Sequence, residues 1–233
     1  MEYNSDYAKY FPYISTRDYK QDAAFLSDWI GDILNPKIMD FGAGCGLHLK
    51  QLIRNQGALN YLGVELSEHM RRESYQRGVT NLVEGIEQVE DKDFTHIYSM
   101  YNVLNCIGPS LIANTLDQIL NRLQSGGQFL FETWDAEGID LDQLKETERS
   151  FEYQGCSHKL TCNPTGVNGN SLKLHYRIKK NGFTICESVQ HIFLHPKKIF
   201  ERLSSSHKKN ISWRGGLINK SNKTSLSLIG LIH

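Results

Sequence analysis

IMDFGAGCGLHLKQL, residues 38–52, places three glycines within five positions, at 42, 44 and 46. A short apolar run precedes them and a helix-like pattern follows. The stretch therefore predicts a buried strand, a tight turn and the start of a helix. Glycine is costly to order, so three close together usually mark backbone that must approach something closely. This turn is the first candidate for a binding site.

Alternating strands and helices surround the turn. Helix-like spacing before it ends at Asn35-Pro36, and strand-like runs recur at 61–66, 80–85, 95–104 and 128–134 with helical patterns between them. This alternation predicts an α/β fold with a doubly wound, mostly parallel Rossmann-like sheet. Three segments between 149 and 195 alternate apolar and polar residues and are separated by Asn-Gly or Gly-Asn turns, which predicts an antiparallel β insertion. A helix and a closing strand pair are expected after it.

Composition narrows the class of partner. The 233 residues are 39% hydrophobic and 22% charged, with 26 basic and 26 acidic side chains, so no global field favours nucleic acid or an anionic membrane. No secretory signal opens the chain, and no apolar run reaches the roughly 18 residues of a membrane span. Five scattered cysteines predict reduced thiols in a cytoplasm. The spacing of Cys156, His158 and Cys162 matches no common zinc motif, and no metal site is expected.

The residues around the turn discriminate between ligands. A phosphate-gripping P-loop needs Lys-Ser/Thr after its glycines, and Leu47-His48 stands here. The dinucleotide fingerprint needs a third glycine where Leu47 lies. Glu65, at the end of the next strand, is placed to accept hydrogen bonds from a ribose diol. Asp40, before the turn, suits a cation such as an amino-acid ammonium group.

Four motifs in order resemble class I S-adenosylmethionine-dependent methyltransferases over nearly the whole chain. They are DFGAGCG, GVELSEHM, SMYNVLNCIG and LQSGGQFLFETW. A narrower resemblance is to the bacterial deoxysugar N-methyltransferases, which act on the amino group of nucleotide-linked sugars. It rests on the tyrosine-rich arm that ends in Arg17-Asp18-Tyr19, on His48-Leu49, Met100-Tyr101, Glu132 and Trp134, and on the insertion.

The resemblance implies four parts of the chain and S-adenosylmethionine as cofactor, with S-adenosylhomocysteine as product. The parts are an N-terminal arm and helix that form a lid (1–34), a cofactor-binding Rossmann-like core (35–135), the antiparallel insertion (136–195), and a final helix with closing strands of the core (196–233). The implied cofactor contacts are Gly42, Ala43 and Gly44 for the methionine, Asp40 for its ammonium, Arg17 and Tyr19 for its carboxylate, Glu65 for the ribose, Leu66 and Met70 for the adenine, and Met100 and Tyr101 for the sulfonium. The acid that many members use for the adenine amino group is replaced by Ile86, which leaves either Glu87, after a small shift, or the backbone to make that contact.

Residues on the acceptor side are less well marked by the sequence. Methyl transfer is an in-line displacement at a sulfonium, and alignment supplies much of the catalysis. An amine acceptor must also lose a proton, so a general base helps. Cys106 stands where some of the sugar enzymes have a histidine. We expect the catalytic candidates to be Tyr13, Asn102 and Cys106, with Tyr10, Asn105, Trp134, His191 and His195 as further candidates.

We therefore expect a cytoplasmic methyltransferase that acts on an amino or hydroxyl group of a small molecule, a sugar or related metabolite. The alternatives are a methyltransferase acting on protein or RNA, and a catalytically silent cofactor-binding scaffold. The segment after Tyr101 lacks the Asn/Asp-Pro-Pro-Tyr of enzymes that methylate bases or glutamine amides, and the neutral net charge also disfavours nucleic acid. The insertion is expected to cover the acceptor pocket, and it is a candidate homodimer interface.

Overall fold

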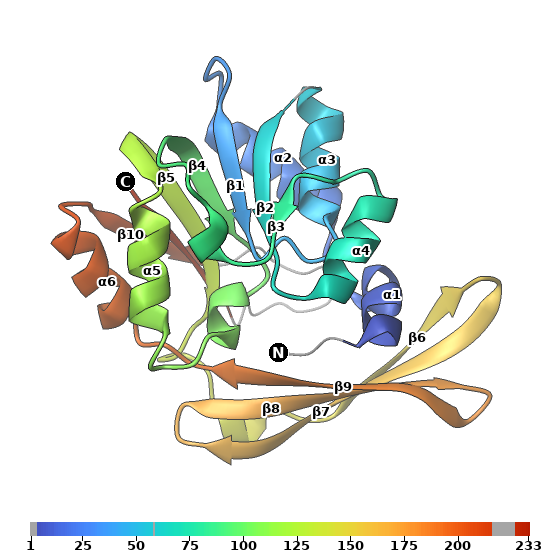
Figure 1. Ribbon diagram of the computed structural model, residues 1–233. Coiled ribbons are helices and arrows are strands. Elements are labelled where there is room, and N and C mark those ends of the chain that lie inside the picture. The colour runs from blue at the N-terminus through green and yellow to red at the C-terminus, as the bar shows by residue number, and fades with distance from the viewer. Residues whose placement is uncertain (1–3, 58, 216–226) are drawn as a thin grey trace.

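Two β-sheets organise the computed structural model, which describes residues 4–57, 59–215 and 227–233 (Figure 1). The strands of the larger sheet are β1 (Lys37–Phe41), β2 (Asn60–Val64), β3 (Leu82–Val83), β4 (Phe94–Ser99), β5 (Leu123–Trp134), β10 (Ile211–Gly215) and β11 (Ser227–Ile232). The strands of the smaller sheet are β6 (Thr147–Tyr153), β7 (Cys156–Asn168), β8 (Ser171–Lys180) and β9 (Phe183–Phe193).

The larger sheet is mixed, in the order β10-β11-β5-β4-β1-β2-β3. Strands β1 to β5 run parallel, with Asp40 of β1 opposite Gly63 of β2 and Tyr98 of β4. Strand β11 is antiparallel to β5 and to β10. Parallel neighbours bring their carboxyl ends to one edge, where open α/β sheets bind ligands. The predicted fold class, a Rossmann-like sheet with an antiparallel final strand and a β insertion, is confirmed.

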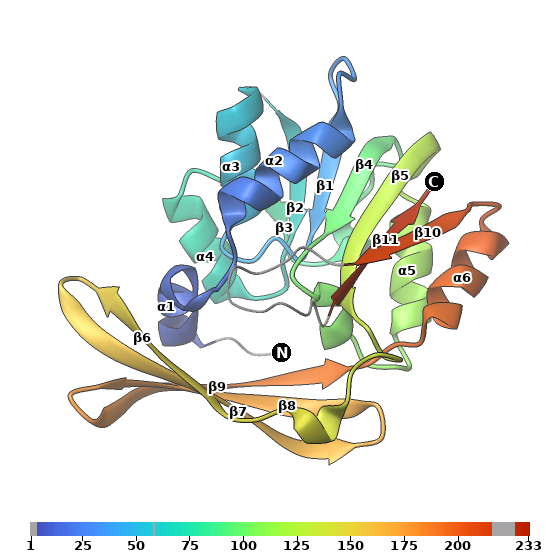
Figure 2. The same cartoon turned by 180° about the vertical axis from the view of Figure 1, so that it is seen from behind.

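Helices cover both faces of this sheet. They are α1 (Ser5–Ile14), α2 (Tyr19–Ile30), α3 (Leu47–Gln56), α4 (Glu68–Gln76), α5 (Ile112–Leu120) and α6 (Lys197–Ser206), with 3-10 turns η1 (Ile86–Gln88), η2 (Val103–Cys106) and η3 (Leu141–Gln143). Figures 1 and 2 show α2 and α3 on one face and α5 and α6 on the other. Neighbouring side chains of β1 alternate accordingly. Ile38 packs with Leu26 and Leu49, and Met39 packs with Leu116 and Phe200. No helix in the described ranges is both long and apolar enough to cross a membrane.

The N-terminal arm contains a helix, α1, that the sequence did not indicate. The side chain of Asn4 caps it by accepting a hydrogen bond from the backbone N–H of Tyr7. Its apolar residues Tyr7, Tyr10 and Ile14 are buried in one cluster with Met70 of α4 and with Leu160 and Ile178 of the smaller sheet. Helix α1 therefore joins the two sheets, and Figure 1 shows it between them.

The insertion is a four-stranded antiparallel meander, β6-β7-β8-β9. Strand β7 was not among the predicted segments, because Pro164 and Gly166 are residues that usually weaken a strand. Both lie near the register shift between Thr165 and Asn168, where the β7–β8 pairing is interrupted. The meander faces the carboxyl edge of the larger sheet (Figures 1 and 2). All five cysteines of the chain are free thiols.

Candidate functional site

A cavity of about 970 Å³ lies between the carboxyl edge of the larger sheet and the insertion. Its walls come from the glycine turn after β1, the end of β2, η1, the end of β4 with η2, the arm around Arg17, and the insertion. Ligand pockets in proteins usually measure roughly 300–1,000 Å³, so this one is at the large end of the range.

The glycine turn forms one wall through backbone alone. Gly42 and Ala43 each donate a backbone N–H to the carbonyl of Val64, at 2.8 and 3.0 Å, which fixes the turn to β2. Gly42 has φ +86° and a Cβ there would lie 2.4 Å from Val103, so only glycine fits. Gly44 has φ +56° and nothing within 4 Å of its Cβ position. The turn therefore exposes backbone to the cavity at Gly44.

Glu65 follows β2 and reaches back to this turn. Its Oε2 accepts the N–H of Gly44 at 2.8 Å, and its Oε1 accepts the N–H of Ser67 at 2.8 Å. Burial raises the pKa of the carboxyl, and the two backbone donors oppose that rise. A carboxylate offers about four acceptor sites, so the two bonds leave capacity for hydroxyl donors from the cavity.

Asp40 lies behind the turn and does not line the cavity. Its side chain is 1% exposed, and its Oδ2 accepts the hydroxyl of Tyr98 at 3.0 Å. Burial raises the pKa of Asp40 to about 7, against the opposing effects of His48 and Tyr98. The side chain is directed into the core beneath the turn, so contact with a ligand ammonium through a water molecule stays a prediction.

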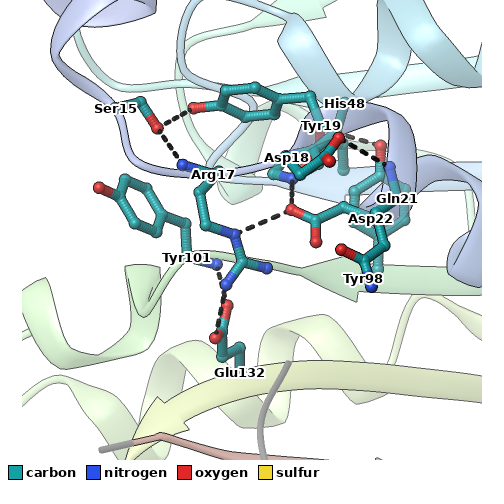
Figure 3. A network of polar contacts seen from close by, with 11 residues as sticks. Ser15, Arg17, Asp18, Tyr19, Gln21, Asp22, His48, Tyr98, Tyr101 and Glu132 are labelled. Atoms are coloured by element: carbon teal, nitrogen blue, oxygen red, sulfur yellow. Dashed lines mark hydrogen bonds and ion pairs between the residues drawn. The ribbon is translucent and has the colours of Figure 1, made fainter. Parts of the chain in front are cut away.

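Arg17 is the centre of a buried polar network that links the arm to α2 and β5 (Figure 3). Its Nε donates to Asp22 Oδ2 at 2.8 Å and its Nη1 donates to Glu132 Oε1 at 3.0 Å. Burial lowers the pKa of the guanidinium, but the charges of Glu132 and Asp22 outweigh that effect and raise it. Its Nη2 is buried without a hydrogen-bond partner among the described residues.

Tyr19 and His48 lie beside this network. The hydroxyl of Tyr19 donates to Ser15 Oγ at 2.7 Å, and its ring meets that of His48 edge-on at 4.8 Å. His48 Nε2 lies 3.0 Å from Asp22 Oδ2. Both rings line the cavity. The aromatic and charged residues of the arm thus form one continuous wall around Arg17.

The turn after β4 carries backbone strain at the site. Tyr101 and Asn102 both have positive φ, +62° and +58°, a region that a bulky side chain such as tyrosine rarely adopts. The N–H of Tyr101 donates to Glu132 Oε2 at 2.8 Å, so the carboxylate that pairs with Arg17 also holds this turn. Asn102 Oδ1 is buried with no hydrogen-bond partner in the described part of the chain, and Asn102 lines the cavity.

Cys106 lines the cavity as well, but as a thiol. Its Sγ accepts Gln190 Nε2 at 3.0 Å, and burial raises its pKa to about 11. At neutral pH the thiol is protonated, which disfavours a role as a base, and a place for Cys106 on the acceptor side stays a prediction.

Tyr13 lies outside the cavity. It is 48% exposed and its ring packs edge-on against Tyr153 at 5.1 Å. Six residues earlier on the same helix, Tyr7 faces the cavity instead. The spacing of Tyr7, Tyr10 and Ile14 on one face of α1 was the signal that could have identified the inward side of this helix.

The remaining predicted residues divide between the cavity and the core. Leu66, Met70, Glu87, Met100 and Trp134 line the cavity, and Ile86 lines it beside Glu87. Asn105 is fully buried and holds β5 to β9, since its Oδ1 accepts the N–H of Trp134 and its Nδ2 donates to the carbonyl of Phe193, both at 2.8 Å. His195 contacts the carbonyl of Ile107 at 3.0 Å, and neither it nor His191 lines the cavity.

Sequence reasoning missed the residues that the insertion contributes. Arg149 of β6, Tyr176 of β8 and Gln190 of β9 line the cavity. The hydroxyl of Tyr176 donates to Gln190 Oε1 at 3.3 Å, and Gln190 in turn donates to Cys106. Within the described residues, no group of three or more His, Cys, Asp or Glu side chains is placed to hold a metal ion.

Comparison with known proteins places this geometry in a family. The model of the methyltransferase domain family matches residues 8–188. No curated protein sequence matches the chain. Among solved structures, DesVI of Streptomyces venezuelae is 17% identical, with a TM-score of 0.76 over 96% of this chain and 95% of that one.

Two further solved structures have the same fold. CalS10 of Micromonospora echinaspora, an amino pentose methyltransferase of calicheamicin biosynthesis solved with bound S-adenosylmethionine, is 14% identical, with a TM-score of 0.74 over 93% of this chain and 92% of that one. KedS8 of a Streptoalloteichus species, a sugar N-methyltransferase, is 14% identical, with a TM-score of 0.71 over 93% and 87%.

Proposed function

The chain belongs to the methyltransferase domain family and is an S-adenosylmethionine-dependent methyltransferase, and we propose that its acceptor is an amino or hydroxyl group of a small molecule, a sugar or related metabolite. The observation that carries the proposal is the cavity of about 970 Å³, which the arm and the insertion close over the cofactor edge of the sheet. A walled pocket suits a small acceptor beside the cofactor, whereas a protein or RNA acceptor needs an open groove. The sugar methyltransferase CalS10 has the same fold, which supports this acceptor class.

The residues that line the cavity fit the cofactor. We assign Glu65 to the ribose, because its carboxylate retains acceptor sites toward the cavity. Gly42, Ala43 and Gly44 offer backbone for the methionine moiety. The buried, unpartnered Nη2 of Arg17 is the donor we assign to the carboxylate, with Tyr19 beside it. Such an orphaned buried donor is costly unless a ligand satisfies it.

The other cofactor contacts are assigned from the residues that line the cavity. We assign Leu66, Met70 and Glu87 to the adenine end, and Met100 and Tyr101 to the sulfonium end, since both sets line the cavity. Asp40 acts only from behind the turn, through the charge and hydrogen bonding of the buried cluster with Tyr98 and His48.

When bound, S-adenosylmethionine supplies an electrophilic methyl group on a positively charged sulfur. The nitrogen or oxygen of the acceptor would form the new bond to carbon, S-adenosylhomocysteine would leave with the electrons of the carbon–sulfur bond, and the proton of the acceptor would pass to solvent. Asn102 Oδ1, buried without a partner, is placed to accept a hydrogen bond from the acceptor and so orient that lone pair. Because the pKa of Cys106 is about 11, it does not take the acceptor's proton, and alignment carries most of the rate.

Calorimetric titration with S-adenosylhomocysteine tests the cofactor assignment. Glu65→Ala should weaken binding by about tenfold or more, since it removes acceptors of charge-assisted hydrogen bonds. Glu68→Gln is the matched control, because Glu68 is an exposed acid of α4 whose ion-pair partner among the described residues is Arg72. Equal affinities in the two variants would remove Glu65 from the ribose site. A wild-type protein that binds no S-adenosylhomocysteine would favour the silent scaffold.

A transfer screen with methyl-labelled cofactor tests the acceptor class. The panel contains amino sugars, nucleotide-linked sugars, simple amines, peptides and RNA. We expect label only in the small molecules. Label in peptide or RNA but in no small molecule would contradict the proposal.

A further inference from the structure

The charged residues of the cavity are distributed unevenly between its two sides. The acids that line it are Glu65, Glu84, Glu87 and Glu132, and all of them belong to the core. The described residues that the insertion contributes include one charged side chain, Arg149 of β6. The side facing the acceptor therefore has a cation and no carboxylate of its own.

Arg149 has no counter-ion in the described part of the chain. Among the described residues, no carboxylate lies within 4.0 Å of its guanidinium, and no side-chain or backbone acceptor bonds to it. The other arginine of the cavity, Arg17, pairs with two acids at 2.8 and 3.0 Å. The acid beside Arg149 on the same strand, Glu148, pairs with Lys159 instead. Half-buried guanidinium groups that face a cavity are usually paired, so an unpaired one indicates a ligand group.

The position of Arg149 places its charge within reach of the reacting end of the site. It pairs in register with Leu160 on β7, and both line the cavity, as do Thr147 and Cys162 on the same two strands. Burial raises the pKa of Tyr101, whereas Ser15, Arg17 and Arg149 act to lower it. The positive charge of Arg149 therefore acts electrostatically on Tyr101, in the turn after β4.

We propose that the guanidinium of Arg149 binds an oxyanion of the acceptor, a phosphate or a carboxylate, while the acceptor's amino or hydroxyl group lies toward Asn102. This inference rests on the proposed function. Guanidinium presents parallel N–H donors that match the two oxygens of a carboxylate or phosphate. Recognition of the acceptor's charge is then separate from recognition of the cofactor, which uses the opposite wall.

Titrating two anions into the protein loaded with S-adenosylhomocysteine tests the proposal and shows whether Arg149 prefers a phosphate or a carboxylate. Inorganic pyrophosphate represents a phosphorylated acceptor, and succinate represents a carboxylate. Titrations at fixed ionic strength compare wild type, Arg149→Gln, Arg149→Lys and Arg177→Gln. Arg177 is the matched control because it lies in the same sheet, outside the cavity, and pairs with Glu187 on the surface.

We expect wild type and Arg177→Gln to bind one of the two anions equally. Arg149→Gln should weaken that binding by about 10- to 100-fold, the loss typical of a charge-assisted hydrogen-bond pair, and Arg149→Lys should lie between. Affinity for S-adenosylhomocysteine should stay within about twofold in all variants, which also shows that they are folded. Anion binding that is the same in wild type and Arg149→Gln, or absent from wild type, overturns the proposal.

The two proposals fail in different ways. If S-adenosylhomocysteine does not bind, the cofactor assignment fails, and the same anion titrations on the unloaded protein still test Arg149. If the cofactor binds and the transfer screen finds an acceptor without an oxyanion whose kcat/KM is the same in wild type and Arg149→Gln, the inference about Arg149 fails alone.

Discussion

Glu132→Gln is the substitution that most directly tests how the arm and the strained turn are coupled. One carboxylate oxygen of Glu132 accepts a hydrogen bond from Arg17 Nη1 at 3.0 Å, and the other accepts one from the N–H of Tyr101 at 2.8 Å. The side chains of Arg17 and Glu132 are only 3% and 1% exposed. Glutamine keeps the shape but has one oxygen and one NH₂ group. Whichever way the amide is oriented, one of the two donors then faces another donor.

The magnitude follows from these contacts. Removing one partner of a buried ion pair costs about 3–5 kcal/mol, and an orphaned buried donor costs about 1–3 kcal/mol. Arg17 keeps Asp22 at 2.8 Å, so we expect the low end, about 3 kcal/mol. For a chain of this length that corresponds to a fall in Tm of roughly 6–12 °C. Because the turn next to the reacting end relaxes, kcat should fall by about 10- to 100-fold.

Thermal unfolding and single-substrate kinetics check both numbers. Glu148→Gln is the control, since Glu148 is half-exposed and its pair with Lys159 on the insertion should be worth less than about 0.5 kcal/mol. The Arg17→Gln and Glu132→Gln variants should not be additive, because the residues share one contact. A Glu132→Gln protein with the Tm and kcat of the control would refute the coupling of the arm to the turn.

The other predictions concern the turn, the buried acid and two of the catalytic candidates, Cys106 and Tyr13. Gly42→Ala should abolish S-adenosylhomocysteine binding or folding, since the new Cβ would lie 2.4 Å from Val103 at a positive φ; a variant that binds normally in calorimetry would contradict this. The folded-state pKa of Asp40, about 7, is above its unfolded value, so the folded protein binds the extra proton and stability falls as pH rises from about 4 to 7, by at most about 1.4 kcal/mol per unit. Urea unfolding at pH 5 and 7 should show a smaller fall for Asp40→Asn, and equal slopes would show that Asp40 does not titrate there. Cys106→Ser should keep kcat within about tenfold and leave the alkaline limb of its pH profile unchanged, because the thiol is already protonated. Tyr13→Phe should leave kcat and KM unchanged, whereas a loss of more than about tenfold would restore Tyr13 to the site.

The proximity of Glu65 to the glycine turn, at the proposed cofactor site, was predictable because the contacts there are local in sequence. Glu65 contacts Gly44 and Ser67, and the turn contacts the end of the next strand, all within one βαβ unit. Strand-turn-helix patterns determine such positions directly. The fold class was predictable for the same reason, since each strand and helix has its own periodic signal.

The acceptor side was not predictable in the same way. Gln190 contacts Cys106 across 84 positions of sequence, and Arg149 lines the same cavity as Tyr101, which is distant from it in sequence. The alternating pattern of a strand separates its two faces, but it does not show which face another part of the protein covers. The five tyrosines of the arm do not by themselves show which one faces inward, whereas the helix that begins after the cap at Asn4 leaves Tyr13 exposed.

The strain at Tyr101 and Asn102 explains why a single sequence cannot indicate this site fully. A tyrosine with φ +62° costs on the order of 1–3 kcal/mol and persists only when its surroundings hold it there. The groups that do so are Glu132 on β5 and, through it, Arg17 of the arm, which is separated from Glu132 by 115 positions. The arm must therefore be closed for the turn to be held. The conformation beside the proposed acceptor position thus depends on two distant segments whose own patterns predict only a helix start and a buried strand.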